Sequence, residues 1–470
     1  MRPAATRNRR ISRAVSCAAT TSVLVLLSGC AAGLASWQRP STQAAPAWRH
    51  ADVQAGTPVG HAARWWESFA DPELDRLVVS SLEGNADLVA SAVRVRRAQL
   101  QSSLAGTNRT PSVTASAEYT NARDLRRDQT LPKTGTIGLE MTYELDLWGR
   151  LLAARSVAEW EAQATEQDRE ALRHSIAYTT STLYWTAGLL NERITLSEAS
   201  IADASRTLEL VMARSSAGAT SGLEPAQARQ TLAALRATHA RLLQLRVENL
   251  NALNVVLGRP LDAETPVPQR LSFQDLPAVN AGIPAEVIGR RPDLQAAESR
   301  LRSSFSNVQA TRADFYPRLS LTGSLGSTST ALSELLRNPI GTLGTQLVLP
   351  FVQWNTNRLT AQVSEADYEE SVARFRQSVH LALSEVENSL SARGRLLEES
   401  DWLTQSLDHA RQAERIAAVR YRAGATELRS WLDAQEVTRN AQVQLAQNRF
   451  DRLANTAALF KALGGDPAVR

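Results

Sequence analysis

The residue with the most specific chemistry in the sequence is Cys30, which ends the tetrapeptide Leu27-Ser28-Gly29-Cys30. A start with five arginines and no acidic residue precedes it, followed by an apolar stretch, and this order is typical of a secretory signal peptide. The tetrapeptide matches the bacterial lipobox, in which a lipid is attached to the cysteine sulfur and the leader is cut before it. We therefore expect residues 1–29 to be a lipoprotein signal peptide, Cys30 to carry the lipid, and residues 30–61 to form an extended tether.

The residue two places after Cys30 indicates the destination. It is Ala32 rather than the aspartate that retains bacterial lipoproteins in the inner membrane, so the sorting rule of that class predicts the outer membrane. The apolar stretch before Cys30 is too short for a comfortable membrane helix. The alternative is an ordinary signal peptide with an incidental cysteine.

Catalytic and metal-binding patterns are missing from the sequence. The six histidines (50, 61, 174, 239, 380 and 409) are scattered, with no H-E-x-x-H motif and no Cys/His cluster. Neither a G-x-S-x-G turn nor a nucleotide-binding G-x-x-x-x-G-K-[ST] loop is present. Since Cys17 leaves with the leader, the mature chain keeps one cysteine and no intrachain disulfide. The sequence predicts no enzyme, no metal and no cofactor.

The charge of the chain gives no case for nucleic-acid binding. Removing the leader with its five arginines lowers the formal charge from +4 to −1. A near-neutral mature chain lacks the basic surface that nucleic acids require.

The stretch from Thr136 to Trp148 predicts the element around which the chain is organised. Its residues alternate strictly between apolar and polar types, as in a strand with one face in each environment. About 9–11 tilted residues cross a bilayer, so the length fits a membrane span. We expect lipid to contact the apolar faces of this strand and its equivalent. The predicted lipid-facing residues are Leu139, Met141, Tyr143, Leu145, Leu347 and Leu349.

The chain contains an internal repeat, in which the second copy follows the first at an offset of 206 residues. Five places align without a gap. They are Asn85 to Leu88 with Arg291 to Leu294, Pro111 with Pro317, Trp148 with Trp354, Arg214 to Thr220 with Arg420 to Thr426, and Leu257-Gly258 with Leu463-Gly464. We expect the first repeat at residues 62–262, a proline-bearing linker at 263–283, the second repeat at 284–464 and a tail at 465–470.

Each repeat is predicted to contain the same elements in the same order. A helix comes first, two strands follow, then a helix of about 65 residues, a glycine turn and a returning helix. The expected ranges are 72–107 and 284–314 for the first helices, 149–214 and 355–420 for the long helices, and 223–257 and 428–463 for the returning helices. The return strands are expected at 136–148 and, on the alternation of Leu343, Thr345, Leu347, Leu349 and Phe351, up to residue 351. A long helix would reach roughly 100 Å.

Four amphipathic strands cannot close a barrel, and a bilayer tolerates only closed sheets. Eight strands fit a dimer and twelve fit a trimer, and the arithmetic does not choose between them. The alternative is a soluble protein with two short hairpins packed on helices.

The lipobox, the duplicated order of elements, the R-x-x-x-G-A-T turns and Leu432-Asp433-Ala434-Gln435 resemble the TolC/OprM outer-membrane efflux family, in its lipoprotein (NodT-type) branch. The resemblance implies a mainly α-helical homotrimer, in which four strands per chain make a twelve-stranded membrane β-barrel above an α-helical barrel in the periplasm. It also implies the function of a passive exit duct for drugs or other toxic small molecules. The implied partners are a periplasmic adaptor and an inner-membrane pump of the RND type.

The resemblance assigns two kinds of site. Asp433 takes the place of an aspartate whose three copies constrict the periplasmic end of the duct. Arg429, one turn earlier, departs from the family, which usually has an apolar residue there, and it would pair with Asp433 if it faces the axis. Gly218, Thr220, Gly424 and Thr426 take the place of adaptor-docking turns. The alternatives are a solvated surface aspartate and ordinary glycine caps at helix ends.

Two other functions stay open. One is an outer-membrane conduit for type I protein secretion, and the other is a structural periplasmic coiled-coil lipoprotein. The sequence leaves undecided the exported substrate, the cognate pump and adaptor, whether the resting gate is open, and whether Arg429 lines the pore.

Overall fold

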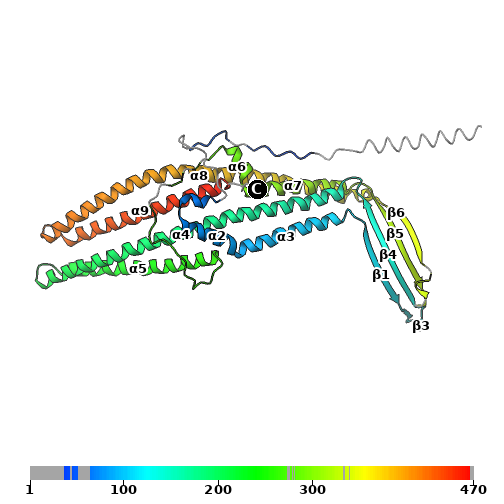
Figure 1. Ribbon diagram of the computed structural model, residues 1–470, viewed down its shortest axis with the longest axis horizontal. Coiled ribbons are helices and arrows are strands. Elements are labelled where there is room, and N and C mark those ends of the chain that lie inside the picture. Colours follow the sequence, from blue (N-terminus) through cyan, green and yellow to red (C-terminus); the bar gives the residue numbers. More distant parts are fainter. Residues whose placement is uncertain are drawn as a thin grey trace, which may run out of the picture.

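The computed structural model shows a long body of helices with a four-stranded sheet at one end (Figure 1). It describes residues 36–42, 45–50, 64–272, 276–277, 279, 281–331, 334–337 and 339–465. The expected signal peptide, Cys30 and most of the expected tether lie outside these residues.

The two halves of the chain repeat one order of elements, as predicted. The first half contains η1 (Trp65–Phe69), α2 (Pro72–Gly84), α3 (Ala86–Thr107), β1 (Ser112–Thr120), β2 (Arg123–Asp124), β3 (Gln129–Thr130), β4 (Thr134–Leu145), α4 (Arg150–Ser216) and α5 (Leu223–Val256). The second half contains α6 (Pro284–Arg290), α7 (Pro292–Ala313), β5 (Arg318–Ser329), β6 (Ile340–Val348), η3 (Pro350–Gln353), α8 (Trp354–Arg422) and α9 (Leu428–Ala462).

The prediction of one continuous helix at the start of each half was wrong. The helix breaks at Asn85 in the first half and at Arg291 in the second. The Asn85 side chain accepts hydrogen bonds from the backbone N–H groups of Asp87 and Leu88 and so caps a new helix. In the second half Pro292 occupies the first position of the new helix, where its missing N–H costs nothing.

Both breaks hold the end of the returning helix by the same contact. The Asn85 Nδ2 donates to the carbonyl oxygen of Val256 at 2.9 Å, and the Arg291 Nη1 donates to that of Ala462 at 3.1 Å. All four residues keep the 206-residue offset. The duplication has therefore preserved a donor position while the side chain that supplies the donor changed.

The two return strands end earlier than predicted. β4 stops at Leu145 because the Asp146 carboxylate accepts the N–H groups of Leu151 and Leu152 and thereby starts α4. β6 stops at Val348, so Leu349 lies just beyond the strand. Phe351 lies in η3, which begins at Pro350, because proline cannot continue the ladder.

The long helices α4 and α8, of 67 and 69 residues, match their predicted ranges to within two residues at each end. At 1.5 Å a residue each spans roughly 100 Å. Each pairs with its returning helix, so two hairpins run to the end of the body farthest from the sheet (Figure 1). No helix of the described residues is both long and apolar enough to cross a membrane.

An aromatic core fixes the middle of the body, where the two halves meet. Trp65 stacks on Phe460 with ring centroids 5.8 Å apart, and Phe69 contacts Trp185 at 4.9 Å. These residues belong to a buried cluster that joins η1, α2, α4, α5 and α9. The core therefore holds the two hairpins at their base, and contacts nearer the turns must hold their far ends together.

Candidate functional sites: the sheet and the hairpin turns

The sheet has one apolar and one polar face. Its strands are antiparallel in the order β1-β4-β5-β6, and residues opposite each other in the register share a face. Leu139 lies between Ala115 and Leu325, and Leu319 lies between Leu145 and Leu347. The apolar face carries Val113, Ala115, Ala117, Tyr119, Ile137, Leu139, Met141, Tyr143, Leu145, Leu319, Leu321, Leu325, Leu343 and Leu347.

The opposite face carries mainly polar side chains, with Glu118, Glu140 and Glu144 among them and Ile340 and Val348 as apolar exceptions in β6. Every predicted lipid-facing residue except Leu349 lies in a strand and on the apolar face. Several side chains of the apolar face are exposed, and Leu343 on this face is 89% exposed. A folded protein rarely leaves so large an apolar face uncovered in water.

The sheet also has two open edges. β1 and β6 are its outermost strands, and each pairs on one side only. Unpaired backbone N–H and C=O groups cost several kcal/mol each in lipid. A sheet of this kind cannot enter a bilayer until other strands complete it.

Aromatic side chains gather where the sheet joins the helices. Trp148 stacks on Tyr316 with centroids 4.9 Å apart, and Phe315 meets Trp354 edge to face at 5.9 Å. Trp354, Phe351 and Tyr316 stay 59%, 50% and 46% exposed. Rings at the rim of an apolar band are typical of the boundary between lipid and water. This group of aromatic side chains was not predicted from the sequence.

The hairpin turns at Gly218 and Gly424 are glycine caps at helix ends, which was the alternative to adaptor-docking turns. Both glycines are left-handed, with φ of +71° and +76°. The N–H of Ala219 donates to the Arg214 carbonyl and that of Ala425 to the Arg420 carbonyl, each at 2.9 Å, which is the Schellman pattern. A side chain at either glycine would meet only open space. The turns are thus hydrogen-bonded, exposed ends of the body, and Thr220 and Thr426 lie two residues after the glycines.

Near these turns, the two hairpins are held together by a contact that we call the turn lock: Arg214, Glu224 and Tyr421. Arg214 on α4 donates to the backbone carbonyl of Tyr421 at 2.9 Å, with its guanidinium 4.8 Å from the ring centre. The Tyr421 hydroxyl donates to Glu224 Oε2 on α5 at 2.8 Å. Burial and the bond to the Glu224 carboxylate raise the pKa of Tyr421 to about 12. The phenol therefore keeps its proton across the physiological range.

The packing around the turn lock is apolar. Tyr421 is 1% exposed and lies 5.5 Å from Trp431, in a cluster with Val211, Leu428 and Leu432. Burial strengthens the lock because little water competes for its hydrogen bonds. No contact between Arg214, Glu224 and Tyr421 was predicted from the sequence, because Tyr421 lies about 200 positions from the other two residues.

Arg429 and Asp433 lie one turn apart on α9, as their spacing predicts. Arg429 Nε is 2.8 Å from Asp433 Oδ1, and the two side chains are 67% and 51% exposed. An exposed pair of this kind contributes roughly 0.3–0.5 kcal/mol, too little to shape the fold. Both charges therefore remain available to the surroundings.

No group of His, Cys, Asp and Glu residues within the described ranges has an arrangement that could hold a metal ion. Asp71, whose carboxylate accepts three hydrogen bonds, acts as a helix cap. It accepts the N–H groups of Glu73 and Leu74 and the hydroxyl of Tyr184. These contacts satisfy the carboxylate within the core.

Comparisons with known proteins agree with this geometry. The family model of the outer membrane efflux protein matches residues 77–259 and 283–465. The chain is 34% identical over 414 residues to the pyoverdine export outer membrane protein OpmQ of Pseudomonas putida, covering 86% of this chain and 88% of that one. It is 28% identical to the probable efflux pump outer membrane protein TtgC of Pseudomonas putida, covering 94% and 93%.

Among solved structures, the outer-membrane channel OprN superposes with a TM-score of 0.81 at 27% identity, covering 92% of this chain and 98% of that one. The two family matches are displaced by the same 206 residues as the internal repeat. The predicted family, fold, efflux function and outer-membrane location, with helices reaching into the periplasm, are confirmed. The chain belongs to the outer membrane efflux protein family and is the outer-membrane channel of an efflux system.

Proposed function

We propose that the chain acts as a homotrimer whose three sheets close a twelve-stranded barrel in the outer membrane. The two open edges, β1 and β6, support this proposal, because a ring of such sheets pairs every edge. The apolar face with Leu139, Met141, Tyr143, Leu145 and Leu347 then contacts lipid, and the polar face lines the duct. The aromatic side chains at the junction with the helices mark the inner boundary of the membrane.

The proposed cargo is small organic molecules, moved passively. The names of two relatives, one for pyoverdine export and one for an efflux pump, support small molecules over the secretion of proteins. Energy would come from an RND-type pump in the inner membrane, linked by a periplasmic adaptor. The exposed turns at Gly218 and Gly424, with Thr220 and Thr426 beside them, are the proposed docking points.

The proposed periplasmic gate has two parts. Three copies of Asp433 would form a ring around the symmetry axis and favour cations. Arg429, 2.8 Å from Asp433, would partly neutralise the negative charge of each carboxylate. The turn lock would keep the hairpins closed, because the duct can widen at its end only if α4 and α5 part from α8. The buried hydrogen bond from Tyr421 to Glu224 carries this proposal.

Single-channel conductance in planar bilayers tests the ring. Asp433→Ala should lower cation preference and change conductance, whereas the matched control Asp408→Ala should do neither. Asp408 is also exposed, at 70%, and also lies near an arginine, Arg411, at 4.0 Å. Unchanged ion preference in Asp433→Ala would remove Asp433 from the gate.

Site-specific crosslinking in cells tests the docking turns. A photoreactive residue that replaces Thr220 or Thr426 should crosslink to the adaptor. One that replaces Thr404, an exposed residue 18 positions before the end of α8, should not. Silence at both turns would leave them as helix caps alone.

A further inference from the structure

An apolar cavity of about 530 Å³ lies on the sheet near the end that points away from the helices. Its floor is the apolar face at Ala117, Ile137 and Leu325, and its rim is Leu336 and Pro339 from the loop between β5 and β6. The volume lies within the range of small-ligand sites. In the proposed barrel the cavity opens toward lipid, in the half of the membrane farthest from the periplasm.

The cavity contains one polar group that the protein leaves unsatisfied. Ser327 is 5% exposed and lines the cavity, and its Oγ has no hydrogen-bond partner among the described residues. A buried hydroxyl without a partner costs roughly 1–3 kcal/mol. A ligand with an ester or amide carbonyl attached to an alkyl chain would accept this hydrogen bond and fill the apolar space.

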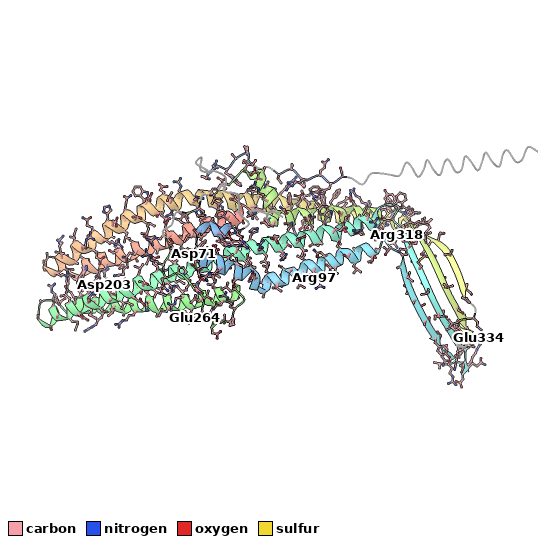
Figure 2. The ribbon with its side chains drawn as sticks, viewed as in Figure 1. Asp71, Arg97, Asp203, Glu264, Arg318 and Glu334 are labelled. Carbon is pink, nitrogen blue, oxygen red and sulfur yellow. The ribbon has the colours of Figure 1, made fainter. Side chains whose placement is uncertain are left out.

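The loops at the same end combine exposed leucines with cations. Leu125 is 88% exposed and Leu336 is 79% exposed. Within the described ranges, the side chains of Arg126, Arg127 and Lys133 form no ion pair, whereas the Arg123 side chain pairs with Asp128 at 2.6 Å. The backbone N–H groups of Arg126 and Arg127 donate to Asp124 Oδ1, which leaves both guanidinium groups available. Figure 2 shows Glu334 of the second loop at this far end of the sheet. Leucines beside free cations are typical of a surface that enters an anionic interface.

The two loops are close enough to act on one ligand. The loop between β1 and β4 leaves the sheet at the pair Thr120 and Thr134, next to the pair Tyr119 and Gly135. A Cβ on Gly135 would lie 3.4 Å from Leu335 Cδ1 of the second loop. The cationic loop therefore borders the segment that forms the rim of the cavity.

We propose that this end of the sheet is a binding site for an acylated lipid of the outer leaflet that carries more than one phosphate. One acyl chain lies in the cavity, its carbonyl accepts a hydrogen bond from Ser327, and the phosphates contact Arg126, Arg127 and Lys133. The inference rests on the proposed contact of the apolar face with lipid. It adds one specific lipid ligand to a surface for which the proposed function requires only contact with the hydrocarbon of the bilayer.

Native mass spectrometry of the purified full-length trimer measures the binding of added bisphosphorylated lipid A. The triple variant R126Q/R127Q/K133Q should bind it about a hundredfold more weakly, since each cation near an anionic surface contributes about fivefold. The matched control R94Q/R96Q/R97Q, which removes three cations from α3 in the helical body (Figure 2 labels Arg97), should bind as the wild type does. Ser327→Leu fills the cavity and should also weaken binding.

Two further ligands identify what is recognised. Dephosphorylated lipid A should bind like the triple variant, and inorganic phosphate in millimolar excess should not displace lipid A. Equal binding of phosphatidylglycerol, which has a single phosphate, would overturn the assignment to a lipid with more than one phosphate in favour of any anionic lipid. Equal binding by the wild type and the triple variant would overturn the site altogether. Single-channel conductance in the same preparations separates these outcomes from failure of the barrel, because a chain that never inserts conducts nothing.

Discussion

Tyr421→Phe removes one hydroxyl from the turn lock and nothing else. The phenylalanine ring keeps the packing against Trp431 and the position under Arg214, while Glu224 loses the donor at 2.8 Å. A hydrogen bond to a charged group contributes about 1.5–3 kcal/mol net. If the bond exists only in the closed state, losing it shifts the equilibrium toward the open state by roughly 10- to 150-fold.

The assay is single-channel conductance of the reconstituted protein, scored as the fraction of time spent in the highest-conductance level. The matched control is Tyr184→Phe. The Tyr184 hydroxyl donates to Asp71 Oδ2 at 2.9 Å, and burial together with this bond raises its pKa, but it lies in the core beside α2. The control should lower thermal stability without changing the open fraction.

A pH series gives an independent test of the same bond. Because the pKa of Tyr421 is raised above the ordinary value of 10, the protonated form is favoured in the folded, locked state. The contribution is complete below pH 10 and is lost as pH rises through about 12. The wild type should open across that window and Tyr421→Phe should not respond there. A variant that stays closed, or that opens with the same alkaline profile as the wild type, would refute the lock.

Other predictions concern stability and anchoring. Gly258→Ala should destabilise the fold by more than the roughly 1–2 kcal/mol that a left-handed alanine costs, because φ is +66° and the new Cβ would lie 2.3 Å from the Gly84 oxygen. The control is Gly394→Ala, at an exposed position inside a helix, which should raise the urea midpoint instead. Burial lowers the pKa of His174, so its neutral form stabilises the fold above pH 6.5 and stability falls as acid protonates it; urea midpoints of His174→Gln should lose this dependence. Cys30→Ser should abolish the incorporation of labelled palmitate and leave conductance unchanged, and a loss of conductance would mean that the lipid is needed for insertion.

Much of the fold was predictable from local pattern. Strict alternation identified β4 and its two faces, and the glycines at 218 and 424 fixed the ends of the long helices. The contact between Arg429 and Asp433 followed from a spacing of one helical turn. In each case the residues that determine the feature are close together in the sequence. Their spacing alone was therefore enough to predict the geometry.

The features that were missed have two physical causes. Some local signals were present but were overruled by the surrounding pattern: Asn85 and Pro292 are helix-start signals inside helix-forming sequence, and Pro350 ends an alternation that continues to Phe351. The turn lock had no local signal. Tyr421 and Glu224 become partners only because two long hairpins are held in register by an aromatic core far from them.

The 206-residue repeat has a consequence for how the channel divides its tasks. The residues equivalent to Arg429 and Asp433 in the first half are Leu223 and Gln227, which carry no charge. In the proposed trimer, six walls of the same fold would surround the duct, but only three would bring these charges to the proposed constriction. One copy of the ancestral unit is thus free to diverge in chemistry while its twin preserves the shape, and selectivity can evolve without disturbing the tube.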